Sequence, residues 1–360
     1  MKKIGIMTTG GDCSGLNTVI HRIIRGATLR GWDVWGILDG TDGLCVNPPA
    51  AIRLDDMMLP IENARLAGSF LHNGRANALN FETAAETGRT DVFNKQLRKS
   101  LRALELDALI LIGGNGSLSL AWANRAVYRD VQLICIPKTI DMDMPLTSRT
   151  IGFDTAVQEL TRFCDQLMLT ARSHHRWFVV QAMGRDCGQL ALNAGVAAGA
   201  SAILIPEIKF DVDSLIEHIK HAQPDYGIIM VAEGITLRGH SGRPADMISR
   251  KLTAAGIVNR TAYPEHIQRA GDTTATDRIL ATRFADCALQ AIENNETYVM
   301  TALECDDVHT VALSDFVDAG EIVRDPKIPD LMTSNAYVSP DDALLSVAHD
   351  MGIYIGTIKK

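Results

Sequence analysis

The chain has 360 residues, enough for a full hydrophobic core and about one to three domains. Apolar residues make up 46% and charged residues 22% of the sequence, which excludes disorder as the dominant state. The 35 Lys and Arg against 43 Asp and Glu leave a formal charge of −8, which disfavours a surface that binds nucleic acid. The 7 Cys include no pair at CxxC spacing, so we expect reduced thiols rather than a disulfide scaffold or a zinc ribbon.

The N-terminus begins like a signal peptide, with two lysines, but does not continue as one. Its apolar run is broken by Thr8, Thr9 and the glycines that follow, which makes it too short for a signal-peptide core. No stretch reaches the roughly 18 continuous apolar residues of a membrane span. The nearest, residues 190–206, is typical of a buried helix followed by a strand. We therefore expect a soluble protein of the reducing cytoplasm, with no membrane partner.

Short runs rich in Ile, Val and Leu recur along the chain and end in Gly or polar residues. They are residues 4–7, 108–112, 133–136, 178–183 and 228–232. Runs of this length are typical of strands buried on both faces. The segments between them predict helices over residues 17–30, 92–104, 155–171 and 211–222. This alternation predicts an α/β fold with parallel sheets, in which ligands bind beyond the carboxyl ends of the strands.

We predict two lobes, each a mostly parallel sheet flanked by helices. Residues 1–150 with a return segment at about 270–310 would form one lobe, and residues 151–270 the other. The remaining 310–360 would be a peripheral tail. After Thr301 the alternation of apolar and polar residues predicts a strand pair and a short helix. No repeat or Pro/Ser-rich linker marks the boundaries.

Two glycine-rich loops follow predicted strands. They are GGDCSGLN at residues 10–17 and GGNGS at residues 113–117. Glycine lets backbone N–H groups approach an anion, and the helix that follows favours negative charge at its N-terminus. Neither loop matches the dinucleotide or P-loop consensus. Each loop alone is either a phosphate site or simply a tight turn from strand to helix.

Three further segments carry groups suited to catalysis or to anion binding. In PKTIDMD, residues 137–143, one carboxylate could take a proton from a substrate hydroxyl while the other orders a cation or an arginine; the alternative is a solvated acidic turn. In MGRD, residues 183–186, Arg185 could bind an anion bidentately. In EHIQR, residues 265–269, a strand would place cationic side chains on one face. For any single arginine, a plain surface role is the alternative.

Together, these five segments resemble the 6-phosphofructokinase family over roughly residues 3–290. The family motifs read approximately GGDxxGxN, GGDGS or GGDDS, [PG]xTIDND, xMGRxxG and GHxQRGG, and this chain carries their counterparts in the same order. The resemblance implies a glycolytic kinase that uses Mg²⁺. It would transfer the terminal phosphoryl group of ATP to the 1-hydroxyl of fructose 6-phosphate. It also implies a homo-oligomer, dimeric or tetrameric, whose subunits share an active site.

The resemblance also implies a role for individual positions. The catalytic set is the general base Asp141, Thr139 at the transferring group and the transition-state arginine Arg185. The donor-binding set is Gly11, Arg75, Asn115, Gly116, Ser117 and Lys138, with Asn115 also serving the metal. The sugar-phosphate set is Asp143, Met183, Gly184, Glu233, His266 and Arg269, with Arg176 and Arg260 reaching the 6-phosphate of a neighbouring subunit.

Several positions depart from the family pattern. Asn115 stands in place of the usual magnesium-organising Asp, and Met142 in place of the usual Asn. His21 and Met168 occupy positions where regulated bacterial members carry effector-binding arginines, although Arg25 remains. We therefore do not expect the usual regulation by nucleotides or phosphoenolpyruvate.

The phosphoryl donor is the main ambiguity. Gly116 resembles ATP-dependent members, because the Asp of pyrophosphate enzymes at this position blocks the α-phosphate of a nucleotide. Lys138 resembles pyrophosphate-dependent members. We expect ATP as the donor, because space for the α-phosphate at Gly116 is less easily met by chance than a lysine at position 138. The alternatives are a pyrophosphate-dependent enzyme, a kinase of another sugar phosphate, and a catalytically weak regulatory subunit.

Overall fold

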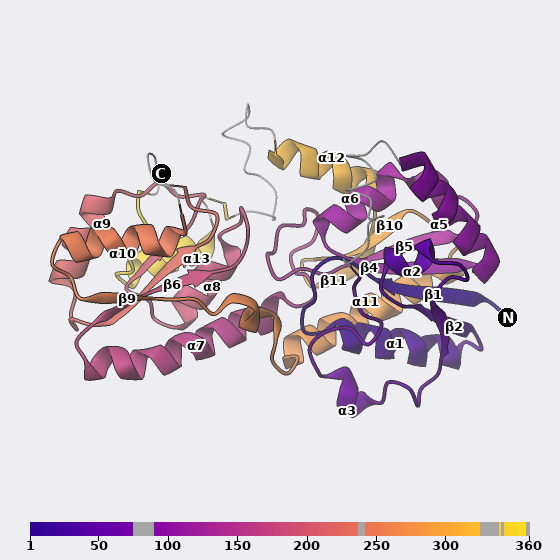
Figure 1. Cartoon of the computed structure of the whole chain (residues 1–360), viewed down its shortest axis with the longest axis horizontal. Helices are drawn as coiled ribbons and strands as arrows, with labels where there is room; N and C mark the ends of the chain where they lie inside the picture. Colours follow the sequence, from indigo (N-terminus) through magenta and orange to yellow (C-terminus); the bar gives the residue numbers. More distant parts are fainter. Residues whose placement is uncertain (75–89, 237–241, 325–337, 340–341, 358–360) are drawn as a thin grey trace. The chain divides into compact units, whose positions relative to one another are not determined.

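The computed structural model describes residues 1–74, 90–236, 242–324, 338–339 and 342–357 (Figure 1). These residues fall into two compact units. Among the described residues, unit 1 takes in Met1–Thr139, Met144–Gly152 and the chain from Asp272 to the end of α12. Unit 2 takes in Ile140–Asp143, Phe153–Gly271 and the described residues from 338 onward.

Unit 1 is built on a seven-stranded sheet with the strand order β11-β10-β5-β4-β1-β2-β3. Its strands are β1 (Lys3–Thr8), β2 (Asp33–Ile37), β3 (Ala51–Leu54), β4 (Ala108–Gly113), β5 (Gln132–Pro137), β10 (Val299–Glu304) and β11 (Asp307–Ala312). The central strands pair in parallel, and only β3 and β11, at the two edges, are antiparallel to their neighbours. The carboxyl ends of β5, β4 and β1 therefore lie side by side.

Helices cover both faces of this sheet (Figure 1). They are α1 (Leu16–Leu29), α2 (Thr41–Cys45), α3 (Ile61–Ala64), α5 (Thr90–Leu104), α6 (Asn115–Ala123), α11 (Ala275–Glu293) and α12 (Leu313–Arg324), with a short 3₁₀ helix η1 (Arg125–Val127). α1 buries Leu16, Val19, Ile20, Ile23 and Ile24, which is the spacing of a helix with one apolar face. That helix packs beside α11.

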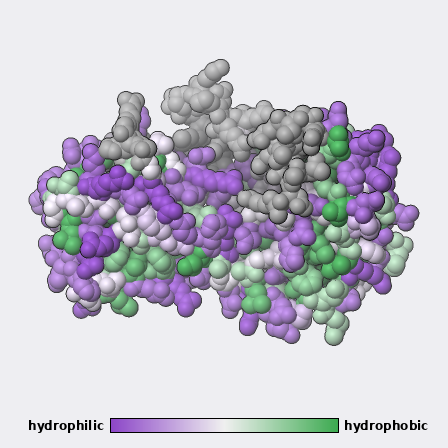
Figure 2. Space-filling model, viewed as in Figure 1, coloured by the Kyte–Doolittle hydropathy of each residue, from purple (hydrophilic) through white to green (hydrophobic). Residues whose placement is uncertain are grey.

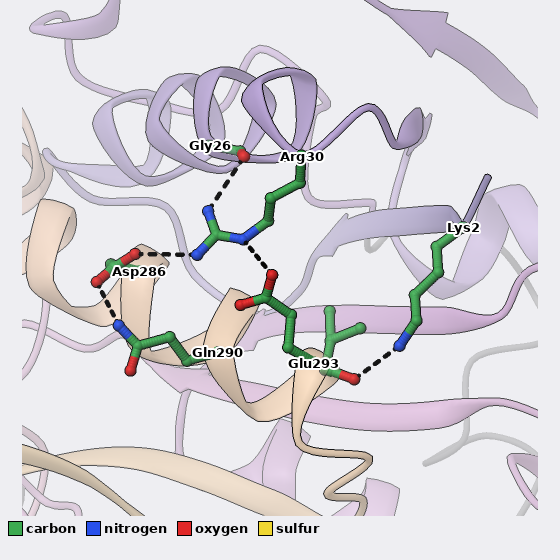
Figure 3. A network of polar contacts seen from close by, with 7 residues as sticks. Lys2, Gly26, Arg30, Asp286, Gln290 and Glu293 are labelled. Carbon is green, nitrogen blue, oxygen red and sulfur yellow. Dashed lines mark hydrogen bonds and ion pairs between the residues drawn. The ribbon is translucent and has the colours of Figure 1, made fainter.

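A polar network on the outside of unit 1 ties α1 to α11 (Figure 3). Arg30 donates to Glu293 at 3.0 Å, to Asp286 at 3.5 Å and to the carbonyl of Gly26 at 3.1 Å. Lys2 donates to the carbonyl oxygen of Ile292, the residue before Glu293, at 2.8 Å. The guanidinium thus satisfies a carbonyl near the end of α1 while it pairs with two carboxylates of α11.

Unit 2 holds a four-stranded sheet in which every pairing is parallel, with the order β7-β8-β6-β9. Its strands are β6 (Trp177–Ala182), β7 (Ala202–Leu204), β8 (Gly227–Ala232) and β9 (Asn259–Ala262). Its helices are α7 (Phe153–Ser173), α8 (Gln189–Ala197), α9 (Val212–His221), α10 (Pro244–Ala254) and α13 (Ala343–Asp350), with a 3₁₀ helix η2 (Glu265–Arg269). α9 and α10 share one core with the strands; α7 and α8 pack together.

The predicted α/β architecture with two mostly parallel sheets is confirmed. All six residues of β4 and all six of β8 are buried, as expected for apolar runs covered on both faces. The region 190–206 is the predicted buried helix and strand, α8 and β7. Each predicted crossover helix is present as α1, α5, α7 or α9.

One predicted element is wrong. Residues 265–269 form the 3₁₀ helix η2 rather than a strand. Pro264 precedes it with a φ of −65°, close to the angle at which the proline ring fixes the backbone and suited to the start of a helical turn. In a 3₁₀ helix, residues three apart lie above one another. His266 and Arg269 therefore share a face, which a strand would not allow them to do.

Within the described residues, none of the helices is both long and apolar enough to span a bilayer. All of the cysteines lie in this part of the chain and none forms a disulfide. On the face drawn in Figure 2, hydrophilic and hydrophobic residues are interspersed.

Candidate active site

The first glycine loop of unit 1 leaves the carboxyl end of β1 and enters α1. Gly10 and Gly15 adopt φ of +79° and +94°, a region that favours glycine. Lys138, which follows β5 and is 2% exposed, donates its Nζ to the carbonyl of Gly11. A Cβ on Gly10 would lie 3.3 Å from Ser117 Oγ and 3.5 Å from Lys138 Nζ. Backbone, hydroxyl and ammonium groups thus crowd around this loop, where a side chain at residue 10 would intrude.

The second glycine loop joins β4 to α6. A Cβ on Gly113 would lie 2.7 Å from Ser117 Cβ, and one on Gly114 would lie 3.3 Å from the carbonyl oxygen of Lys138. No atom of the described residues lies within 4 Å of a Cβ built on Gly116. Asn115 is 8% exposed and accepts a hydrogen bond from Ser119 at 3.4 Å. The amino end of α6 therefore offers N–H groups and open space next to the first loop.

Unit 1 thus gathers five predicted donor-binding residues: Gly11, Asn115, Gly116, Ser117 and Lys138. They follow three neighbouring strands because the carboxyl ends of parallel strands share one edge of the sheet. Arg75, the sixth, lies outside the described residues. Thr139 follows Lys138, and its N–H donates to the carbonyl of Ile151 at 3.1 Å.

In unit 2, Asp141 is buried and carries a shifted pKa. Burial is the main cause that raises the pKa of this carboxyl to about 6; the neighbouring charge of Asp143 acts in the same direction, while Arg185 and Arg269 act in the opposite one. Arg185 Nε lies 3.5 Å from Asp141 Oδ2, with 60% of the arginine side chain exposed. So exposed a cation is well screened by water, which explains why burial prevails.

The loop that carries Arg185 is fixed by Glu233, at the end of β8. Glu233 Oε1 accepts the N–H of Gly184 at 3.1 Å and that of Arg185 at 2.8 Å. Both of those residues have positive φ, +135° and +52°, so successive N–H groups point at one oxygen. Such a backbone is costly for arginine, and the Glu233 carboxylate offsets that cost. Glu233 therefore holds the loop in place, in addition to the sugar contact that the resemblance implies.

Gln268 links the same strand end to η2. Its Oε1 accepts the N–H of Met183 at 3.1 Å, and its Nε2 donates to the carbonyl of Glu265 at 3.0 Å. The side chain is 1% exposed. Gln268 was not among the residues singled out from the sequence, yet it positions the turn that bears His266 and Arg269. The only sign of this role in the sequence is that Gln268 is a polar residue between two predicted ligands, His266 and Arg269.

Arg176 and Arg260 lie elsewhere in unit 2. Arg176 directly precedes β6, and its Nε is buried with no hydrogen-bond partner in the part of the chain that the structure describes. Arg260, in β9, is paired in register with Phe178 at the start of β6. Met183 to Arg185 follow the other end of this strand, which spans roughly 20 Å at 3.3 Å per residue. These two arginines are thus not brought together with Asp141 and Arg185.

The comparison with known families decides what these loops belong to. The family model described as Phosphofructokinase matches residues 3–292. The chain belongs to the phosphofructokinase family.

Known phosphofructokinases cover the whole chain. The protein named ATP-dependent 6-phosphofructokinase 1 of Nostoc sp. is 36% identical over 99% of this chain and 99% of its own length. The protein named pyrophosphate–fructose 6-phosphate 1-phosphotransferase of Amycolatopsis mediterranei is 34% identical over 87% of this chain and 94% of its own. The solved phosphofructokinase of Saccharomyces cerevisiae superposes with a TM-score of 0.78 at 26% identity; the match covers 98% of this chain and 48% of that one.

The resemblance noted from the sequence predicts Mg²⁺ beside the donor loops. No group of three or more His, Cys, Asp or Glu in the described ranges could hold a metal alone. Mg²⁺ is usually held by one or two protein oxygens together with substrate phosphates and water. The amide oxygen of Asn115, at the amino end of α6, is a neutral oxygen ligand of that kind. The residues present therefore fit an ion carried in by a phosphate ligand.

Proposed function

We propose that this chain is an ATP-dependent 6-phosphofructokinase, which transfers the terminal phosphoryl group of ATP to the 1-hydroxyl of fructose 6-phosphate. The observation that carries the proposal is Asp141, a buried carboxylate with a pKa of about 6 beside the guanidinium of Arg185. A general base works best when its pKa lies near the working pH. At neutral pH Asp141 is mostly ionised and can accept the proton.

Asp141 takes the hydroxyl proton as the sugar oxygen attacks the phosphorus. Phosphoryl transfer depends mainly on positioning and on stabilising charge on the equatorial oxygens. The guanidinium of Arg185, which stays 60% exposed, is available to bind those oxygens. Because Glu233 fixes the backbone of residue 185, the guanidinium starts from a defined position and pays little reorganisation on binding.

The donor would bind to unit 1. The N–H groups of Gly11 and of the first turn of α6 would meet its phosphates, and Ser117 and Lys138 would add a hydroxyl and a charge. The open space at Gly116 supports a nucleotide, because no described atom lies within 4 Å of a Cβ built at this position. Asn115 would hold the Mg²⁺ that arrives with the donor, and that ion would supply charge neutralisation for the phosphates.

Lys138 supports a second candidate, a pyrophosphate-dependent enzyme. Its ammonium is 2% exposed and lies against the first glycine loop, and a lysine at this position resembles the pyrophosphate-dependent members of the family. The relative from Amycolatopsis mediterranei is named for pyrophosphate. We favour ATP because the Nostoc relative, named for ATP, matches the whole chain.

The sugar phosphate would bind to unit 2, near His266, Arg269 and the loop held by Glu233. We propose that Arg176 and Arg260 serve a neighbouring subunit, since both start from the opposite end of β6. A homo-oligomer, dimeric or tetrameric, with shared sites follows. Mixing an Asp141→Asn protein with an Arg260→Gln protein and measuring recovered turnover tests this: recovery requires a shared site.

The decisive experiment is a coupled assay that combines ATP or pyrophosphate with several sugar phosphates. We expect turnover with ATP and fructose 6-phosphate. Turnover only with pyrophosphate would change the assigned donor from ATP to pyrophosphate. Turnover only with another sugar phosphate would change the assigned acceptor. No turnover with any pair refutes both enzyme candidates and leaves the regulatory subunit.

A further inference from the structure

The start of α11 is a point at which three segments of unit 1 are joined. Thr273, two residues before the helix, accepts the N–H of Gly15 at 3.0 Å with its Oγ1, and donates that hydroxyl to the carbonyl of Arg65 at 2.8 Å. Asp277, in the first turn, accepts the N–H of Gly152 at 3.2 Å. Both side chains are 1% exposed. No role was assigned to either residue from the sequence or from the family resemblance.

The two glycines that these side chains hold tolerate no side chain of their own. Gly15 and Gly152 have φ of +94° and +99°. A Cβ on Gly15 would lie 2.7 Å from Ile151 Cγ2, and one on Gly152 would lie 2.5 Å from Cys13 Sγ. The donor loop and residues 151–152 are therefore tightly packed, with the Ile151 side chain against Gly15 and the Cys13 side chain against Gly152. From the start of α11, the Thr273 hydroxyl and the Asp277 carboxylate accept the N–H groups of these two glycines.

Residue 151 in turn carries the segment that leads to the base. Ile151 donates its N–H to the carbonyl of Pro137 at 3.2 Å and accepts that of Thr139 at 3.1 Å. Thr150 Oγ1 donates to the carbonyl of Thr139 at 2.8 Å. Residues 137–139 thus form a short parallel bridge with 151. What fixes Gly152 also fixes the register of Lys138 and Thr139.

We propose that Thr273 and Asp277 are positioning residues for phosphoryl transfer. Thr273 sets the donor loop through Gly15, and Asp277 sets the segment of residues 137–139 through Gly152, both from the end of one rigid helix. The donor's phosphates and Thr139 would then keep one spacing through the reaction. Misplacement of reacting groups by about 1 Å can cost on the order of a hundred-fold in rate. This inference rests on the proposed function.

The sequence held a signal for this site. Thr274, Ala275, Thr276 and Asp277 form the [ST]-x-x-[DE] pattern of a capped helix start. In the structure Thr274 caps α11 by accepting the N–H of Asp277 at 3.3 Å. The Asp277 carboxylate, however, turns to Gly152 rather than only completing the cap. A residue that served only to cap α11 would not need to bond a backbone N–H of another segment, as Asp277 does with Gly152.

The test is Thr273→Val, which keeps the side-chain volume and removes both hydroxyl contacts. Leaving the buried N–H of Gly15 without its partner should raise the Kd and KM for the donor about ten-fold, with KM for the sugar phosphate unchanged. Thr273→Ser should restore the wild-type values. Thr282→Val, an exposed position on α11 whose hydroxyl only bonds the carbonyl of Arg278, is the matched control and should change neither.

A merely structural role predicts a different result. Thr273→Val would then lower Tm, while donor Kd and turnover below the transition stay at wild-type values, and this overturns the Thr273 half of the proposal. Asp277→Asn is the second variant, which keeps an acceptor but loses the charge. We expect kcat to fall about five-fold, since hydrogen bonds to charged groups are the stronger ones, with donor Kd unchanged. An unchanged kcat overturns the Asp277 half.

Calorimetric titration with Mg·ATP and with pyrophosphate separates this inference from the proposed function. Wild-type protein that binds a donor without turnover refutes the activity alone. The Kd difference between wild type and Thr273→Val still decides the positioning role. Wild-type turnover with no Kd change in Thr273→Val refutes the positioning role alone.

Discussion

The two units present their candidate ligand groups by different means. Unit 1 uses backbone: glycine loops after β1 and β4, the amino end of α6, and one buried ammonium on Lys138. Unit 2 uses charged side chains of both signs, with Asp141 and Arg185 side by side and Glu233 beneath the loop. Backbone sites are sensitive to added volume, whereas side-chain sites are sensitive to charge and pH. Substitutions in the two units should therefore fail in different ways.

The largest effect is expected in unit 2, from Asp141→Asn. Loss of the base should lower kcat about 10²–10⁴-fold with little change in sugar-phosphate KM. A large rise in KM with kcat preserved would contradict the role of base.

The Asp141→Asn variant should also be more stable than the wild type. The folded protein binds the Asp141 proton more tightly than the unfolded chain, so stability falls as pH rises from about 3.8, the ordinary pKa of an aspartate, through about 6. Tm of Asp141→Asn should exceed wild type at pH about 7 and approach it near pH about 4.

Arg185→Gln should combine a rate effect with a pH effect. We expect kcat to fall about 10²-fold, the usual loss of one transition-state donor. Because Arg185 lowers the pKa of Asp141, its removal should raise that pKa. The acid limb of the kcat profile, expected near pH 6 in the wild type, should move to higher pH. Arg250→Gln, exposed on α10, is the control; an unmoved limb in Arg185→Gln would refute the electrostatic contact.

Gly116→Asp tests volume and charge in unit 1. The position is open within 4 Å, so the protein should fold, while a carboxylate faces the α-phosphate of a nucleotide. We expect KM for ATP to rise at least about ten-fold, because like charges brought together cost several kcal/mol, with a smaller change for pyrophosphate. Gly116→Asn, which has the same shape without the charge, separates the two causes. Equal effects on both donors would refute the donor assignment.

The smallest effect should come from Arg30→Gln, outside both sites. Arg30 is 23% exposed and pairs with Asp286 and Glu293 on α11. Such partly screened pairs contribute about 1 kcal/mol or less, so Tm should fall by about 2 °C, with kcat and both KM values unchanged. A change in donor KM would mean that α11 transmits strain from its C-terminal end to the donor loops. The polar network around Arg30 would then not be separate from the proposed site.

The strands were predictable because their signal is strong. Apolar runs such as 108–112 and 228–232 are typical of strands buried on both faces of a sheet, and glycines that follow them mark the ligand edge. The family motifs then located most of the candidate site. The apolar runs could not specify the turn after Pro264. The pattern of residues 265–269, with His266 and Arg269, is compatible with a strand and with a 3₁₀ helix.

The supporting residues were harder to predict. Gln268 and Thr273 act on backbone groups more than 80 residues away in sequence, 85 residues from Met183 and 258 from Gly15. No local pattern encodes such a partner. Glu233 was predicted as a sugar contact, yet its visible work is to bind two N–H groups of the Arg185 loop. That role follows only once Gly184 and Arg185 are known to have positive φ.

The chain crosses between the units more than once, and this limits how such a protein can be rearranged. Phe153–Gly271 is one uninterrupted stretch of unit 2, bounded by Gly152 and Asp272 of unit 1, but the short stretch Ile140–Asp143 belongs to unit 2 as well. A gene fusion that exchanged residues 153–271 as a cassette would replace most of the proposed sugar contacts and leave Asp141 with the host. If the proposed roles hold, acceptor specificity and the base are inherited through separate pieces of the gene, and a swap can change the one without remaking the other.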